Sequence, residues 1–118
     1  MSESIQIIEQ LSVILKERLS AKTDKSYVAS LYVKGNNKIL EKVGEEATEV
    51  ILAAKDCEKS PEKNNVLVKE VADLWFHTMV LLTHLDISPI EVLEELQRRF
   101  GESGLVEKSK RNNKGGDD

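Results

Sequence analysis

The stretch that decides the fold is residues 38–84, which read KILEKVGEEATEVILAAKDCEKSPEKNNVLVKEVADLWFHTMVLLTH. Apolar residues recur at helical spacing over residues 38–56 and again over residues 61–84. Between them, Ser60 and Pro61 are typical of a helix start, with an N-cap residue followed by proline. Carboxylates also occur inside both apolar patterns, where unpaired charge is costly. The stretch therefore predicts two helices that fold back on each other around acidic side chains that need compensation.

Four of these acidic residues form two pairs. At about 100° per residue, Glu46 and Glu49 lie within about 60° of each other on the first helix, and Glu70 and Asp73 do so on the second. Both pairs are equally far along the chain from the turn at residues 58–61, so folding back there brings them to the same height. Carboxylates this close repel one another unless they ionise incompletely or bind a cation. An all-oxygen cluster suits a hard cation such as Mg²⁺, so the sequence predicts a metal site.

The position of each acid relative to the apolar stripe predicts its role. Glu46 lies at the edge of the stripe, Glu49 lies further out and Glu45 furthest. We therefore expect Glu46 and Glu49 to be direct ligands, and Glu45 to act in the outer shell or on water. His77 shares the face of the second acidic pair, and we interpret it as a core histidine hydrogen-bonded to an acid there, since a hard cation does not need imidazole.

The rest of the chain also reads as helix. Residues 4–20 form an amphipathic pattern, and residues 27–33 fit a short helix better than a strand, because no other segment offers a strand a partner. Gly35 is suited to end that helix, and an asparagine after it to cap the next. A capping box predicts a last helix over residues 88–100. The sequence therefore predicts an all-α bundle of about four to five helices.

The helix predicted over residues 61–84 is apolar almost all round. Such a helix must be central, or it must bury a face against a second subunit. A hairpin with one flanking helix on each side does not cover every apolar face of this segment, and a large exposed apolar patch is unusual for a monomer. We therefore expect a homodimer that completes the helical bundle.

The composition is that of an ordinary single domain. The chain has 118 residues, of which 40% are apolar and 32% charged, so we expect one all-α domain over residues 1–107. The net charge of −4 argues against nucleic-acid binding, and no run of about 18 apolar residues predicts a membrane span, so we expect a cytoplasmic protein. Residues 108–118 contain no apolar side chain and are predicted to form a disordered tail.

The acidic pattern resembles a known signature. Glu45-Glu46-x-x-Glu49 followed by Glu70-x-x-Asp73 is similar to the metal-binding motif of the all-α, MazG-like nucleotide pyrophosphohydrolases. Within that group, the chain from residue 4 to about residue 112 resembles the phosphoribosyl-ATP pyrophosphohydrolase family of histidine biosynthesis. The resemblance is carried by five segments, which are residues 26–31, 34–35, 38–40, 42–49 and 53–55.

The resemblance implies an enzyme of MazG-like fold that hydrolyses phosphoribosyl-ATP to phosphoribosyl-AMP and pyrophosphate, the second step of L-histidine biosynthesis. It also implies a homodimer and a Mg²⁺ cofactor, for which Mn²⁺ could substitute. The ligands it implies are Glu46, Glu49, Glu70 and Asp73, with Glu45 close by.

The chemistry of such a hydrolysis suggests roles for further residues. It requires charge neutralisation and an oriented water, and Glu45 is our candidate for orienting or deprotonating that water. Lys34, Lys38 and Lys42 are spaced by four around the break at Gly35 and are candidate phosphate-binding groups that act as point charges.

Two other function classes stay open at this point. A house-cleaning pyrophosphohydrolase of nucleoside and deoxynucleoside triphosphates would use the same metal site, and only residues 26–42 distinguish it from the first reading. A non-catalytic helical interaction protein would leave the converging acids unexplained. A di-iron bundle is disfavoured, because the chain has no Glu-x-x-His motif.

Overall fold

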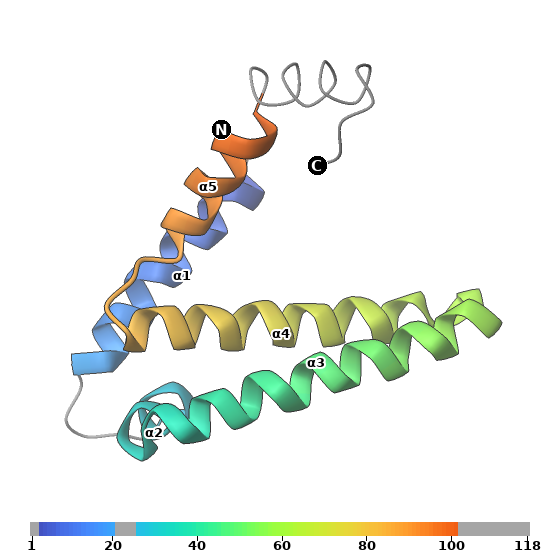
Figure 1. Cartoon of the computed structure of the whole chain (residues 1–118), viewed down its shortest axis with the longest axis horizontal. Coiled ribbons are helices and arrows are strands. Elements are labelled where there is room, and N and C mark those ends of the chain that lie inside the picture. The colour runs from blue at the N-terminus through green and yellow to red at the C-terminus, as the bar shows by residue number, and fades with distance from the viewer. Residues whose placement is uncertain (1–2, 21–25, 102–118) are drawn as a thin grey trace, which may run out of the picture.

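The computed structural model describes residues 3–20 and 26–101, with side chains from residue 6 onward. These ranges contain no strand, which confirms the predicted all-α class (Figure 1). The predicted tail at residues 108–118, and the end of the domain expected at residue 107, lie outside the described residues. The elements are α1 (Glu3–Ser20), α2 (Tyr27–Lys34), α3 (Asn36–Lys59), the 3₁₀ turn η1 (Pro61–Lys63), α4 (Asn64–His84) and α5 (Ile90–Phe100).

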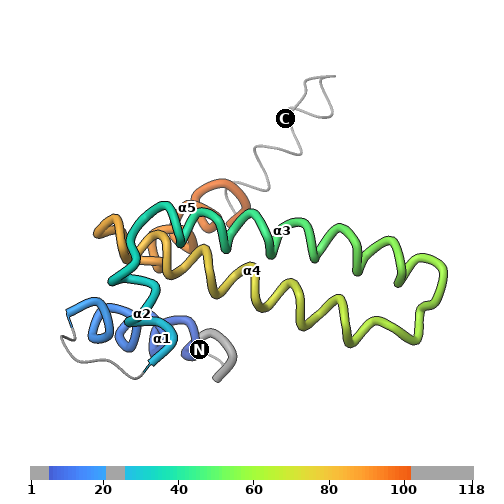
Figure 2. Tube along the Cα trace, turned by 90° about the horizontal axis from the view of Figure 1, so that it is seen from below, coloured from blue at the N-terminus to red at the C-terminus, as the bar shows by residue number. Residues whose placement is uncertain are grey.

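The predicted hairpin is the main feature of the fold. α3 and α4 run antiparallel along most of their lengths and are joined at the tip by η1 (Figures 1 and 2). α1 lies against α4, and α5 packs on α1 (Figure 1). α2 fills the corner between α1 and the start of α3. The molecule measures 56 × 36 × 30 Å. It is elongated because the tip of the hairpin projects beyond the other helices (Figure 2).

The hydrophobic core lies at one end of the hairpin. Four of its side chains are fully buried, and they come from different helices, α1, α2, α3 and α4. Towards the tip of the hairpin the apolar side chains are open instead, as Leu52 on α3 and Val68 on α4 show, with 55% and 66% of their surfaces exposed. The fully buried core residues are Leu15, Leu31, Ile39 and Val80.

A single residue links α2 to α3. Gly35 has φ +95°, in the region that favours glycine, and its N–H donates to the Leu31 carbonyl at 3.0 Å to close α2. α3 begins at the next residue, Asn36, and no side chain caps it. The predicted asparagine cap is therefore wrong. The link is too short to place an asparagine at the capping position, and the glycine itself occupies that position.

The other caps agree with the sequence only in part. Ser60 makes no side-chain cap bond, and Pro61 starts the 3₁₀ turn instead of α4, which begins three residues later at Asn64. At α5 the N-cap position is held by Pro89, which offers no side-chain cap, so the predicted capping box at Ser88 is wrong, although the Ser88 hydroxyl accepts the Ile90 N–H at 3.2 Å. The short helix predicted over residues 27–33 is confirmed as α2, where the Ser26 hydroxyl accepts the Ala29 N–H at 3.1 Å.

None of the helices in residues 3–20 and 26–101 is long and apolar enough to cross a membrane.

Replacing Gly35 and Gly44 by alanine should change the stability of the fold in opposite directions. Gly44 sits in the middle of α3 with nothing within 4 Å of an added Cβ, so Gly44→Ala should stabilise the fold by up to about 1 kcal/mol. At Gly35 the space is also open, but φ is +95°, so Gly35→Ala should destabilise by at least about 1 kcal/mol. Urea unfolding followed by circular dichroism measures both free energies. Two shifts of the same sign would contradict this account of the α2–α3 link.

Candidate metal centre

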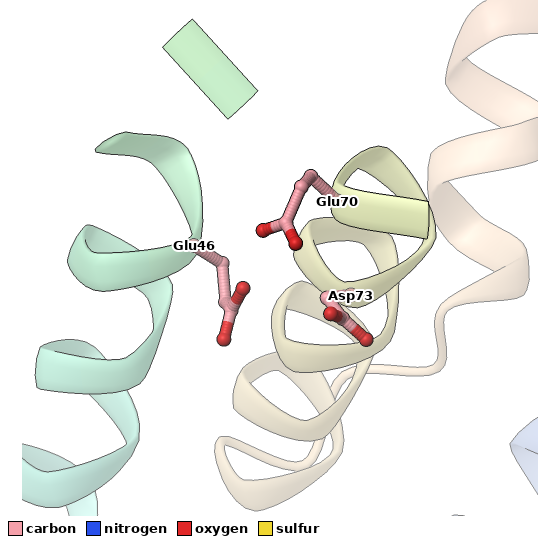
Figure 3. A group of neighbouring side chains, drawn as sticks. All are labelled: Glu46, Glu70 and Asp73. Atoms are coloured by element: carbon pink, nitrogen blue, oxygen red, sulfur yellow. The ribbon is translucent and has the colours of Figure 1, made fainter. Parts of the chain in front are cut away.

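Three acidic side chains meet between the two helices of the hairpin. Glu46 comes from α3, and Glu70 and Asp73 come from successive turns of α4. One carboxylate oxygen from each lies within 4.8 Å of the others, and Figure 3 shows the three groups converging on the space between the helices. The cause is the antiparallel pairing of α3 with α4, which sets the middle of one helix against the middle of the other. The predicted convergence of acids from two helices is therefore present for three residues.

The site concentrates negative charge. Glu46 and Glu70 are half-buried and Asp73 is exposed. The pKa of Glu70 is raised above its ordinary value of 4.5, first by partial burial and then by the like charges of Glu49, Glu46 and Asp73. A bound cation would reverse that repulsion, and carboxylate oxygens are the donors that Mg²⁺ prefers. The residues present therefore fit a hard divalent cation.

Glu49 and Glu45 lie outside this group of three. Glu49 is exposed, and among the described residues the acids that meet within 4.8 Å do not include it, although its charge reaches Glu70. Glu45 is also exposed and forms an ion pair with Lys42, in which the lysine Nζ lies 3.1 Å from Oε1. The order expected from the sequence, with Glu46 the most enclosed of the three, agrees with this placement. The direct-ligand role of Glu49 and the water-handling role of Glu45 stay predictions.

The three candidate phosphate-binding lysines follow one another along α2 and α3. Lys34 ends α2 and is exposed, and Lys38 pairs with Glu41 at 3.3 Å. The pKa of Lys42 is raised, first by its hydrogen bond to Glu45 and also by Tyr27 and Glu46. Lys42 therefore stays fully charged at neutral pH. Binding of substrate by these lysines stays a prediction.

His77 is a core histidine, as the sequence analysis interpreted it. Only 5% of its surface is exposed, and its Nδ1 lies 2.8 Å from the backbone carbonyl of Asp73 rather than from a carboxylate. Its Nε2 lies 2.9 Å from the hydroxyl of Tyr27. This contact with Tyr27 was not predicted, because the two residues lie 50 positions apart in the chain and residue spacing does not show that they meet.

The fold and this site define the chain as an all-α protein of the MazG-like class, with an acidic cluster between two antiparallel helices. The family described as phosphoribosyl-ATP pyrophosphohydrolase matches residues 8–100. A phosphoribosyl-ATP pyrophosphatase of Hydrogenovibrio crunogenus is 55% identical over 108 residues, which are 92% of this chain and 95% of the relative. One of Ruthia magnifica is 52% identical over 107 residues, which are 91% and 97% of the two chains. This chain belongs to the phosphoribosyl-ATP pyrophosphohydrolase family, as its sequence motifs implied.

The charge repulsion at Glu70 should appear in stability. Because its folded-state pKa is raised above 4.5, ionisation of Glu70 weakens the fold, and this penalty is absent at acidic pH and complete at neutral pH. In excess chelator, we expect Glu70→Gln to raise the melting temperature at pH 7 and to leave it unchanged at pH 3.5.

The matched control for this measurement is Glu17→Gln, at an exposed acid on α1. It should shift the melting temperature little at either pH. A melting temperature of Glu70→Gln that equals that of the wild type at pH 7 would contradict the repulsive cluster.

Proposed function

We propose that this chain hydrolyses phosphoribosyl-ATP to phosphoribosyl-AMP and pyrophosphate, the second step of L-histidine biosynthesis. The observation that carries the proposal is the convergence of Glu46, Glu70 and Asp73 in a chain that the family matches over residues 8–100. A purely structural role would leave three mutually repelling carboxylates without a purpose. The cytoplasm, expected from the sequence, is the compartment that we propose.

The cofactor that we propose is Mg²⁺, with Mn²⁺ as a substitute. Glu46, Glu70 and Asp73 would hold it, and Glu49 on the next turn of α3 would complete the set. These residues offer only oxygen donors, which suits a hard cation. When bound, the ion would neutralise charge on the phosphate oxygens and polarise the bond that is cleaved.

The chain itself would supply the base and further positive charge. We assign to Glu45 the orientation or deprotonation of the attacking water, because its exposed carboxylate lies one residue from Glu46 on α3. Its ion pair with Lys42, at 3.1 Å, places a positive charge beside the carboxylate. Lys34, Lys38 and Lys42 would bind phosphate oxygens as point charges.

The substrate and the metal requirement can be tested in one assay of pyrophosphate release. With Mg²⁺ or Mn²⁺, the wild type should hydrolyse phosphoribosyl-ATP in preference to nucleoside and deoxynucleoside triphosphates. Glu46→Gln and Asp73→Asn should lower kcat/KM at least about 100-fold, because each removes charge that the cation requires. Glu49→Gln should have a smaller effect than either, since its carboxylate lies outside the converging group.

Glu17→Gln, on α1, again serves as the matched control and should retain wild-type activity. Full turnover in excess chelator would refute the metal site. Hydrolysis of deoxynucleoside triphosphates without hydrolysis of phosphoribosyl-ATP would refute the substrate and favour a house-cleaning enzyme with the same site.

We also infer that the chain is a homodimer. An apolar groove of about 330 Å³ runs between α1, α4 and α5 and is lined by residues that include Ile8, Met79 and Leu96. Trp75 borders the groove with 62% of its surface exposed, and Val68 on the same helix is 66% exposed. Apolar surface of this kind on a central helix is expected to be covered by a partner, and a second copy related by a two-fold axis offers the same surface in return.

A charge in this groove should disrupt the dimer. We expect the wild type to sediment at twice its chain mass of 13.3 kDa, and Trp75→Glu to dissociate or to unfold at a lower temperature. Gln10→Glu introduces the same charge at an exposed polar position of α1 and should do neither. An active wild-type species of 13.3 kDa at micromolar concentration would refute the dimer.

A further inference from the structure

All the tyrosines and histidines of the chain, two of each, meet where α2 faces α4. Tyr32 stacks on His84 with ring centroids 5.9 Å apart, and no hydrogen bond joins its buried hydroxyl to that ring. Tyr27 meets His77 edge to face at 5.8 Å, and its hydroxyl lies 2.9 Å from Nε2. The two pairs therefore differ in ring geometry and in hydrogen bonding, because only the Tyr27 hydroxyl is bonded to the ring of its histidine.

The direction of the Tyr27–His77 hydrogen bond follows from the other nitrogen of the ring. The Asp73 carbonyl can only accept, so the Nδ1 of His77, 2.8 Å away, must carry a proton and donate it. In the neutral ring Nε2 is then the acceptor. The hydroxyl that faces Nε2 must therefore donate, and the one proton of Tyr27 is committed to His77. What the Tyr27 oxygen still offers is its lone pairs.

Tyr27 stands at the edge of the acidic cluster. Its histidine partner lies one helical turn after Asp73 on α4 and is bonded to the carbonyl of that residue. On the α3 side, the Tyr27 phenol is close enough to Lys42 to raise the pKa of its ammonium group, which Glu46 raises as well. Half of the Tyr27 surface is exposed. A molecule bound over the cluster would thus meet an oxygen that accepts hydrogen bonds and does not donate them.

We propose that Tyr27 is a substrate-binding residue that acts only as an acceptor, and that His77 is the positioning residue that imposes this role. The Tyr27 oxygen accepts a hydrogen bond from a donor group on the nucleotide, which is a ribose hydroxyl or a base amino group. Phosphate oxygens are excluded from it, because an ionised phosphate has only acceptors to offer. Phosphates are left to the cation and the lysines. This inference rests on the proposed nucleotide hydrolysis and adds the recognition of its non-reacting part.

Tyr27→Phe tests the binding role, because it keeps the ring and removes only the hydroxyl. A hydrogen bond to a group remote from the cleaved bond stabilises ground state and transition state alike. We therefore expect KM to rise about fivefold to tenfold with kcat within about twofold of wild type. Binding of Mn²⁺ alone, followed by electron paramagnetic resonance, should be unchanged, which separates a substrate contact from damage to the cluster.

Tyr32→Phe is the matched control, on the same helix and against the other histidine. Its buried hydroxyl makes no hydrogen bond to His84 and does not face the acidic cluster's histidine, so removing it should leave KM and kcat unchanged. An unchanged KM in Tyr27→Phe, or a fall in kcat alone, would overturn the binding role of Tyr27.

The positioning role of His77 has its own readout, which does not depend on activity. Nitrogen-15 NMR of the histidine ring at neutral pH should show a proton on Nδ1 and none on Nε2. A proton on Nε2 would overturn the proposal, since Tyr27 would then be free to donate. If the wild type fails on phosphoribosyl-ATP, the proposed function fails, and the Tyr27 comparison is made with the nucleotide that the wild type does hydrolyse.

Discussion

The repulsion among Glu46, Glu70 and Asp73 is the constraint around which the hairpin is built. Packing of α3 against α4 holds their oxygens within 4.8 Å of one another, and within residues 3–20 and 26–101 no lysine or arginine forms an ion pair with any of them. Lys42, whose pKa Glu46 helps to raise, is paired with Glu45 instead. Partial exposure keeps the repulsion tolerable, because water screens it. The acidic cluster therefore adds little to the stability of the fold by itself, and it becomes favourable when a bound cation neutralises its charge.

The placement of the core explains why such a cluster can persist. The fully buried side chains, such as Leu15 and Val80, gather where α1 and α2 pack on the hairpin, so the main hydrophobic core lies away from the segment that carries the acids. α2 belongs to both regions. Its Leu31 lies in the core, whereas its first residue, Tyr27, reaches the edge of the cluster. One short helix thus fixes the distance between the stable part of the molecule and its chemically active part.

Much of the fold follows from residue spacing alone, and the exceptions have physical causes. Helical periodicity located the hairpin, and the symmetry of the acids about its turn brought Glu46, Glu70 and Asp73 together as expected. Glu49, one turn along α3 from Glu46, lies outside this converging group although its charge reaches Glu70, and its role as a direct ligand stays a prediction. The asparagine cap is wrong because the single residue Gly35 links α2 to α3 and itself takes the capping position, and at Ser60 the first turn is 3₁₀ and no side chain caps it.

The proposed role of Tyr27 could not be predicted from residue spacing. In the proposed mechanism this residue adds recognition of the rest of the nucleotide to the binding of its phosphates. Its proposed role depends on two hydrogen bonds. The Asp73 carbonyl accepts the Nδ1 proton of His77, and Nε2 of His77 then accepts the proton of Tyr27. Nothing within a few residues of Tyr27 specifies these bonds. In the proposed enzyme, acceptors and donors are therefore separated in space. Lysines and the cation meet phosphate oxygens, and the tyrosine oxygen meets hydroxyl or amino groups. A nucleotide that entered the site reversed would set phosphate against lone pairs, so the orientation that places its phosphates at the acidic cluster is favoured before any chemistry begins.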